Sequence, residues 1–277
     1  GQYHEARGLM DASEALRQET DGLAYDKDHR VVGAMILGYE DQEDWALDLV
    51  NQDFCPDPSE WSNLEAGTLL CESVMALFSI GDLSAVNRKL DLAFSEMRSS
   101  GSVLGLNYCY IHAGNVALYS GSFDLASANI SQAVELADNN FGSDSGLKHL
   151  SQVAAYAIKI WKGLASEEDI EPFSQTLSHV EEFDGWAEIY LLGLDAAFQL
   201  CEQVGNYSFA SEIIRRFSFL AKNRNLERLQ NLCRILEMRL AHLRGNTASA
   251  ELIAKEIQDE MLPLRFEQNV RGWQGYC

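Results

Sequence analysis

Proline and basic residues are both scarce in this chain. With 4 prolines and 20 glycines among 277 residues, the composition argues against a linker-rich or low-complexity protein. Only 21 Lys and Arg stand against 42 Asp and Glu, which gives a formal net charge of -21. Such a surface repels phosphate backbones and anionic lipid, so we expect no direct nucleic-acid or membrane partner. The charge fits basic or neutral partners, and equally a helical protein that is acidic for no specific reason.

The chain also lacks paired cysteines and long apolar runs. Its six cysteines are widely spaced, with no C-x-x-C pair, and four of them fall within apolar helical patterns, where a free thiol acts as a small hydrophobe. No run approaches the roughly 18 to 20 apolar residues of a membrane span, and there is no signal peptide. We therefore expect no disulfide framework and a cytoplasmic location. The cysteines are Cys55, Cys71, Cys109, Cys201, Cys233 and Cys277.

No motif for catalysis or metal binding is present. The six histidines show no metal-ligand spacing and no H-E-x-x-H, and there is neither a G-x-S-x-G elbow nor a phosphate loop. The acidic run Glu167–Asp169 with Glu171 is a candidate cation site, but acids also favour a helix start, and we prefer that interpretation. The sequence predicts no enzyme, and no cofactor or metal in this chain.

A glycine followed by a new apolar pattern recurs along the whole chain. Clear copies are "SIGDLSAVNRKLDLAF", "YSGSFDLASANISQAV", "QVGNYSFASEIIRRFS" and "LRGNTASAELIAKEI". The steps between successive glycines are 37 to 43 residues. Such a regular step is typical of a helical repeat protein. The aligned glycines are Gly1, Gly38, Gly81, Gly121, Gly163, Gly205 and Gly245.

Each glycine is expected just past a helix end, in the left-handed conformation that glycine adopts at low cost. Helices of about five turns are predicted before the glycines over 62–81, 102–121, 185–205 and 226–245. Five residues after the glycine stand small residues such as Ala126 and Ala210, where the following helix can approach its partner closely. No segment alternates like a strand. The sequence predicts an all-α superhelical solenoid of about six to seven antiparallel hairpins over residues 1–261. Residues 262–277 are predicted to be a tail that caps the last repeat or leads into another domain.

The best copy resembles a tetratricopeptide repeat. Relative to Gly121, the small residues Gly114, Ala126 and Ala133 and the aromatic Tyr110 stand where that family places them. The step of about 41 residues departs from the family's 34, and the aromatic position holds leucine in other copies. HEAT repeats match the length better but bend their first helix with a proline that this chain lacks.

Longer repeats of this kind look like the sensor region of MalT-type activators, the large ATP-dependent LuxR-family transcription regulators. The segments "GDLSAVNRKLDLAFSEMRSSG" and "GSFDLASANISQAVELADNNFG" carry the resemblance. It implies a longer protein with an N-terminal nucleotide-binding domain and a C-terminal DNA-binding domain. The chain, which opens on "GQYHEA", is then expected to be a piece of that protein. Its expected function is to sense an inducer or a protein partner.

The resemblance also implies that the first helix of each hairpin lines a concave groove. Counting back from each glycine gives candidate groove residues, with Cys71, Met75 and Phe78 as apolar positions of an earlier copy. A mixed aromatic, amide and charged surface suits a metabolite or peptide, although each aromatic could instead pack between repeats. Two alternatives stay open, a peptide-binding scaffold without a small ligand and an all-α enzyme. The candidate groove residues are Tyr108, Asn115, Tyr119, Trp161, Asp195, Gln199, Glu202, Gln203, Arg239 and His242.

Overall fold

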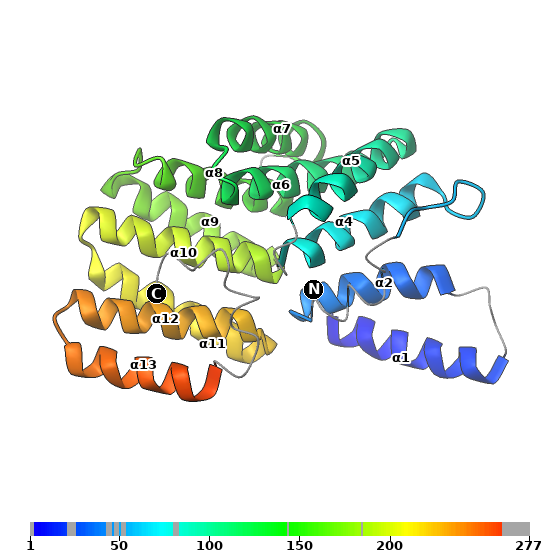
Figure 1. Ribbon diagram of the computed structural model, residues 1–277. Coiled ribbons are helices and arrows are strands. Elements are labelled where there is room, and N and C mark those ends of the chain that lie inside the picture. The colour runs from blue at the N-terminus through cyan, green and yellow to red at the C-terminus, as the bar shows by residue number, and fades with distance from the viewer. Residues whose placement is uncertain are drawn as a thin grey trace.

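The computed structural model describes residues 3–20, 26–42, 46, 50, 54–79, 83–142, 144–183 and 185–261. Over these residues the chain forms twelve α-helices, one short 3-10 helix and no strand, which confirms the all-α prediction (Figure 1). Gly1, Gly81 and the predicted tail lie outside the described residues. The helices are α1 (Tyr3–Thr20), α2 (Asp26–Tyr39), α4 (Asn63–Ser79), α5 (Leu83–Ser100), α6 (Val103–Tyr119), α7 (Phe123–Phe141), α8 (Gly146–Trp161), η2 (Glu167–Asp169), α9 (Ile170–Phe183), α10 (Ala187–Val204), α11 (Tyr207–Arg224), α12 (Glu227–Leu243) and α13 (Thr247–Met261).

The repeat glycines end helices as the sequence predicts. Gly121, Gly205 and Gly245 each have a φ of 75°, and the next helix begins two residues later at Phe123, Tyr207 and Thr247. At α11 the side chain of Asn206 caps the new helix by accepting the backbone N–H of Phe209 at 3.1 Å. A left-handed glycine followed by a capped helix reverses the chain sharply.

Two of the repeat copies depart from this pattern. Gly38 was predicted to end a helix, but it lies inside α2, and the left-handed residue is Asp41, with a φ of 63°. Aspartate tolerates this conformation better than most residues, and the Asp41 carboxylate is held by contacts described below. After Gly163, helix α9 does not begin until Ile170, because η2 comes first. Asp169 accepts the backbone N–H of Ser166 at 2.9 Å and pairs with Lys159 at 2.5 Å, so the acidic run does begin a helical segment.

The helices pack on their neighbours in a regular series. Each packs on the next in the chain, and α4, α6, α8, α10 and α12 also contact one another in turn. Helices α6 and α10 are buried around most of their circumference, whereas α7 buries only one stripe. This stripe contains Ala126 and Ile130, and Ile130 lies so close to Gly114 of α6 that an added Cβ there would be 2.4 Å from its Cδ1. Small residues therefore bring α6 and α7 together, as the sequence predicts. None of the helices in the described part of the chain combines the length and apolar character that crossing a membrane would require.

Candidate functional site

The candidate groove residues of α6 and α8 pack mainly against other side chains. The ring of Tyr119 makes edge-on contacts with Phe78 at 5.2 Å and with Trp161 at 5.4 Å between centroids. Asn115 is buried in α6. Tyr108 is half-buried and contacts a separate cavity. Of these four, Tyr108 lines the cavity described below.

The candidates of α10 and α12 connect helices to one another. Arg239 binds the carboxylate of Glu202 through two nitrogens, Nε to Oε1 at 3.0 Å and Nη2 to Oε2 at 2.8 Å. Gln203 donates to the carbonyl of Ile160 at 2.9 Å. The fully buried Asp195 accepts from Gln199 at 2.5 Å, and His242 is exposed at the end of α12. These contacts join α8, α10 and α12, and a role of these residues in binding stays a prediction.

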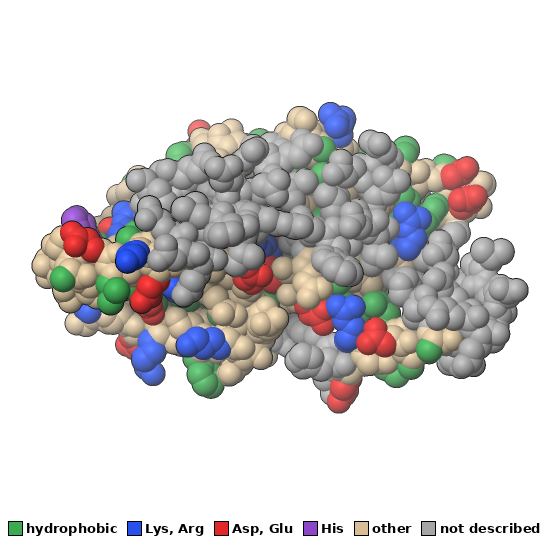
Figure 2. Space-filling model, turned by 60° about the horizontal axis from the view of Figure 1, so that its bottom comes forward, with side chains coloured by type: hydrophobic (Ala, Val, Ile, Leu, Met, Phe, Trp, Pro, Cys, Tyr) green, Lys and Arg blue, Asp and Glu red, His purple; other side chains and the backbone are tan. Residues whose placement is uncertain are grey.

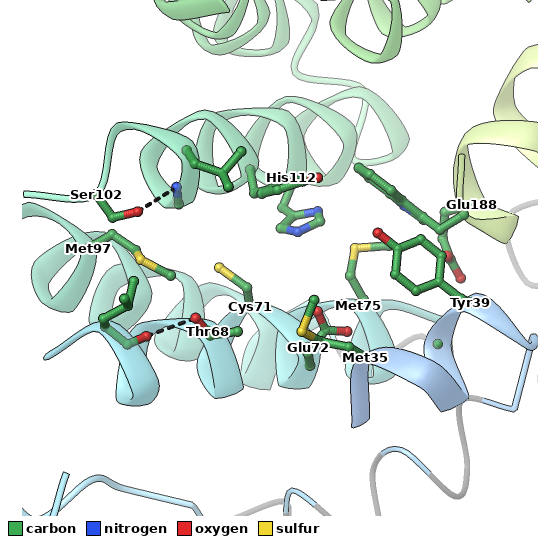
Figure 3. A pocket seen from close by; sticks show the side chains of 16 residues that line it. Met35, Tyr39, Thr68, Cys71, Glu72, Met75, Met97, Ser102, His112 and Glu188 are labelled. Carbon is green, nitrogen blue, oxygen red and sulfur yellow. Dashed lines mark hydrogen bonds between the residues drawn. The ribbon is translucent and has the colours of Figure 1, made fainter. Parts of the chain in front are cut away.

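A cavity of about 300 Å³ lies between α2, α4, α6 and the start of α10, with Met97 of α5 at one end. Figure 3 shows side chains of α4 and α6 pointing toward each other across it, Cys71 and Met75 from one side and His112 from the other. Cys71, Met75 and Tyr108 are groove positions that the resemblance to tetratricopeptide repeats implies. The lining residues are Met35, Gly38, Tyr39, Leu64, Thr68, Cys71, Glu72, Met75, Met97, Ser102, Leu104, Gly105, Tyr108, His112, Trp186 and Glu188.

An aromatic cluster forms one wall of the cavity. Tyr108 and His112 are one helical turn apart on α6 and stack at 6.3 Å between ring centroids. The indole of Trp186, at the start of α10, lies 5.4 Å from Tyr108 and 5.9 Å from His112. Thus two helices from different parts of the chain build one apolar surface.

Two buried polar atoms in this wall lack a hydrogen-bond partner. Nδ1 of His112 and Nε1 of Trp186 have none among the residues that the structure describes. Their side chains are only 4% and 7% exposed. Burial lowers the pKa of His112 to about 4, so its imidazole is neutral at physiological pH. The rings of this wall are therefore uncharged, and its two unpaired nitrogens are themselves buried.

Two carboxylates complete the lining. Glu72 of α4 makes no hydrogen bond or ion pair with a described residue. It is half-buried at the cavity wall, and burial, together with the nearby charge of Glu188, raises the pKa of Glu72 to about 8. An isolated carboxyl group in such surroundings keeps its proton at neutral pH. Glu188 instead accepts from Nη2 of Arg228 at 2.6 Å.

Arg228 of α12 links this site to the end of α2. Its backbone N–H donates to Oδ2 of Asp41 at 2.8 Å, and its Nε donates to Oδ1 of the same carboxylate. Asp41 is thereby a cap for α12, since Leu226 at the N-cap position offers no side-chain acceptor. Burial raises the pKa of Asp41 despite the opposing effect of Arg228. We call Asp41, Glu188 and Arg228 the clasp, because they fasten α2, α10 and α12 together.

Sequence reasoning missed Glu72, His112, Trp186 and Glu188. The helical pattern carried a signal for two of them, because Glu72 lies one turn before Met75 and His112 lies one turn beyond Tyr108. Trp186 and Glu188 enter from a different helix, and their approach depends on the curvature of the whole array.

Three comparisons with known proteins leave the site to be interpreted from its geometry. No family model, curated protein or solved structure matches the chain. The resemblance to MalT-type sensor regions stays a prediction.

Proposed function

We propose that this chain is a ligand-sensing regulatory domain, a tetratricopeptide-like solenoid that binds a small molecule in the cavity between α2, α4, α6 and α10. Two observations support the solenoid. The left-handed glycines Gly121, Gly163, Gly205 and Gly245 recur about every 40 residues. In addition, the alternate helices from α4 to α12 contact one another in series.

The lining of the cavity is the observation that carries the proposal. Its walls enclose about 300 Å³, and they combine an aromatic cluster with three methionines and two carboxyl groups. The mixture of aromatic and thioether side chains with a few polar groups is typical of a small-molecule site.

The clasp provides a route from the cavity to the rest of the domain. Glu188 lines the cavity and also binds Arg228, so a ligand that draws Glu188 toward itself weakens the link to α12. Occupancy would then shift the array between two arrangements. In a cytoplasmic transcription activator of the MalT type, this shift would release or assemble the nucleotide-binding domain.

A thermal-shift screen of this domain against sugars, amino acids, amines, nucleotides and basic peptides tests the proposal. A ligand at about 100 times its dissociation constant adds roughly 2.7 kcal/mol to the free energy of unfolding. Stabilisation by a small metabolite, weakened when Trp186→Phe replaces the indole ring of the cavity wall, would support a sensor.

A peptide-binding scaffold is the competing function, and the net charge of -21 favours a basic peptide for it. On the face shown in Figure 2, however, acidic and basic side chains are interspersed and form no acidic patch among the described residues. A response to peptides alone in the same screen would contradict the sensor and favour the scaffold.

A further inference from the structure

We infer that the cavity takes an organic cation, with its ammonium group beside Glu72 and its apolar body against the aromatic and methionine walls. This inference rests on the proposed function, because it assigns a chemical class to the ligand of that same cavity.

The charge of the lining points to a cation. Two carboxylates line the cavity, and the residues around it that the structure describes include no Lys or Arg. Arg228 forms ion pairs with both Glu188 and Asp41, so one guanidinium balances two carboxylates. Ionised Glu72 would add a third negative charge with no matching cation. An anionic ligand would be repelled, whereas a cation supplies the missing charge.

The surroundings of Glu72 favour its ionisation only when a cation is present. Burial and the neighbouring Glu188 raise the pKa of Glu72 and keep its carboxyl group protonated. An ammonium group beside Glu72 would favour the ionised form, because opposite charges in a poorly solvated site attract strongly.

The walls suit an alkylated ammonium. Figure 3 shows Glu72, Met75, Tyr39 and Glu188 gathered at one end of the cavity and Met97 and Ser102 at the other. Aromatic faces attract cations, and Tyr39, Tyr108 and Trp186 all line the cavity. The ligand is therefore charged at one end and apolar over the rest.

The volume limits the size of this molecule. A dry protein cavity of roughly 150 Å³ holds benzene. The cavity here, at about 300 Å³, has room for about twice that, which corresponds to a monoamine with one ring or a short branched chain.

Three probes of similar shape and different charge test the inference. Phenyltrimethylammonium carries a fixed positive charge, tert-butylbenzene is its neutral counterpart, and benzenesulfonate is the anion. Binding is measured by calorimetry and by ligand-observed NMR. We expect phenyltrimethylammonium to bind at least tenfold more tightly than tert-butylbenzene, and benzenesulfonate not to bind.

The pH dependence of probe binding tests whether Glu72 is the group that binds the cation. Because the probe does not titrate, its apparent affinity should rise about 50-fold between pH 6 and pH 8, as Glu72 gives up its proton, and level off above pH 9. The other titratable groups of the cavity lining are Tyr39, Cys71, Tyr108, His112 and Glu188, and Glu188 is paired with Arg228, which also binds Asp41. His112 stays neutral over this range, and the contact with Cys109 together with burial raises the pKa of Cys71 and keeps its thiol protonated, so neither produces the rise.

Two matched variants complete the test. Glu72→Gln should lose the rise and bind the cation at least tenfold more weakly at pH 8, whereas Glu251→Gln, an exposed change of equal charge on α13, should bind like the wild type. Equal binding of tert-butylbenzene, or an unchanged pH profile in Glu72→Gln, would overturn the cation inference and leave a ligand-binding domain. Silence with all three probes and throughout the metabolite screen would overturn both. The pH profile of the wild type decides the matter even if the Gln variant folds poorly.

Discussion

Asp41 and Arg228 are 187 residues apart in the chain, yet the Asp41 carboxylate accepts the backbone N–H of Arg228 at 2.8 Å. The contact ties the end of α2 to the beginning of α12. Because Arg228 also binds Glu188 at the cavity wall, one arginine connects three helices. The shape of the domain and the shape of its cavity therefore depend on the same side chain.

Removal of this arginine should strongly destabilise the domain. Arg228→Met leaves Asp41 and Glu188 buried without their cation, and loss of one partner from a buried ion pair costs about 3–5 kcal/mol. Arg234→Met on the same helix breaks a more exposed pair with Glu256 and should cost less than about 1 kcal/mol. Urea unfolding of both variants measures the difference. Equal losses would show that the clasp does not hold the helices together.

The empty domain should lose stability as the pH rises, because of Glu72. The unfolded chain releases this proton near the ordinary pKa of 4.5 and the folded chain only at about 8. Protonated Glu72 thus contributes stability below pH 4.5, and the contribution is lost as the pH rises toward 8. Relative to wild type, Glu72→Gln should gain up to about 1.4 kcal/mol per pH unit in this window and nothing further above it.

Urea unfolding at pH 5, 7 and 9 gives the free energies for that comparison. Glu251→Gln should follow the wild type at all three values, since its side chain is exposed. A difference between wild type and Glu72→Gln that does not change with pH would contradict the raised pKa.

The contact between α6 and α7 should tolerate no larger side chain at Ala126. This residue is fully buried, and Ala126→Leu overpacks the interface at a cost of about 1–3 kcal/mol. Ala128 on the same helix is exposed, so Ala128→Leu should change the free energy of unfolding by less than about 0.5 kcal/mol. Thermal unfolding of the two variants separates them, and similar melting temperatures would contradict the close approach of the helices.

Thiol reactivity should distinguish Cys55 from the other described cysteines. Cys55 is exposed, whereas Cys71, Cys109, Cys201 and Cys233 are buried. Burial raises the pKa of Cys201 and of Cys233 to about 12, and the contact with Cys109 raises that of Cys71, so these thiols hold little reactive thiolate. Peptide mapping after iodoacetamide treatment at pH 8 should find Cys55 modified at least 100 times faster. Rapid modification of Cys201 in the folded domain would show that α10 is less buried than described.

Local sequence patterns predicted many of the helices correctly. The predicted segment 102–121 became α6 (Val103–Tyr119), and 226–245 became α12 (Glu227–Leu243), since glycine, cap and apolar spacing all act within a few residues. Gly38 was misread because the left-handed position after α2 holds Asp41 and not a glycine. The turn is closed by the same kind of local bonds as at Gly121, with the N–H of Asp41 donating to the carbonyl of Gly38 at 3.2 Å and that of Gln42 to Leu37 at 2.8 Å.

The cavity was harder to predict than the helices. Tyr108, Cys71 and Met75 line the cavity, and they are positions that the resemblance to tetratricopeptide repeats implies for the groove. Glu202 and Arg239, also chosen by counting, pair with each other across α10 and α12, and no spacing rule reveals that pairing. The approach of Trp186 and Glu188 to α4 and α6 depends on how several helices pack on one another, and a local sequence pattern does not encode that packing.

Methyl NMR of methionine shows directly whether a small molecule binds in the cavity. Met35, Met75 and Met97 line the cavity, whereas Met238 packs against Ile235 and Ile257 at the other end of the chain. Titration of the [13C-methyl]methionine domain with phenyltrimethylammonium, and separately with tert-butylbenzene, should shift the three cavity methyl signals together and leave Met238 unchanged. If neither probe shifts Met35, Met75 or Met97, the cavity is not a binding site and the account is wrong.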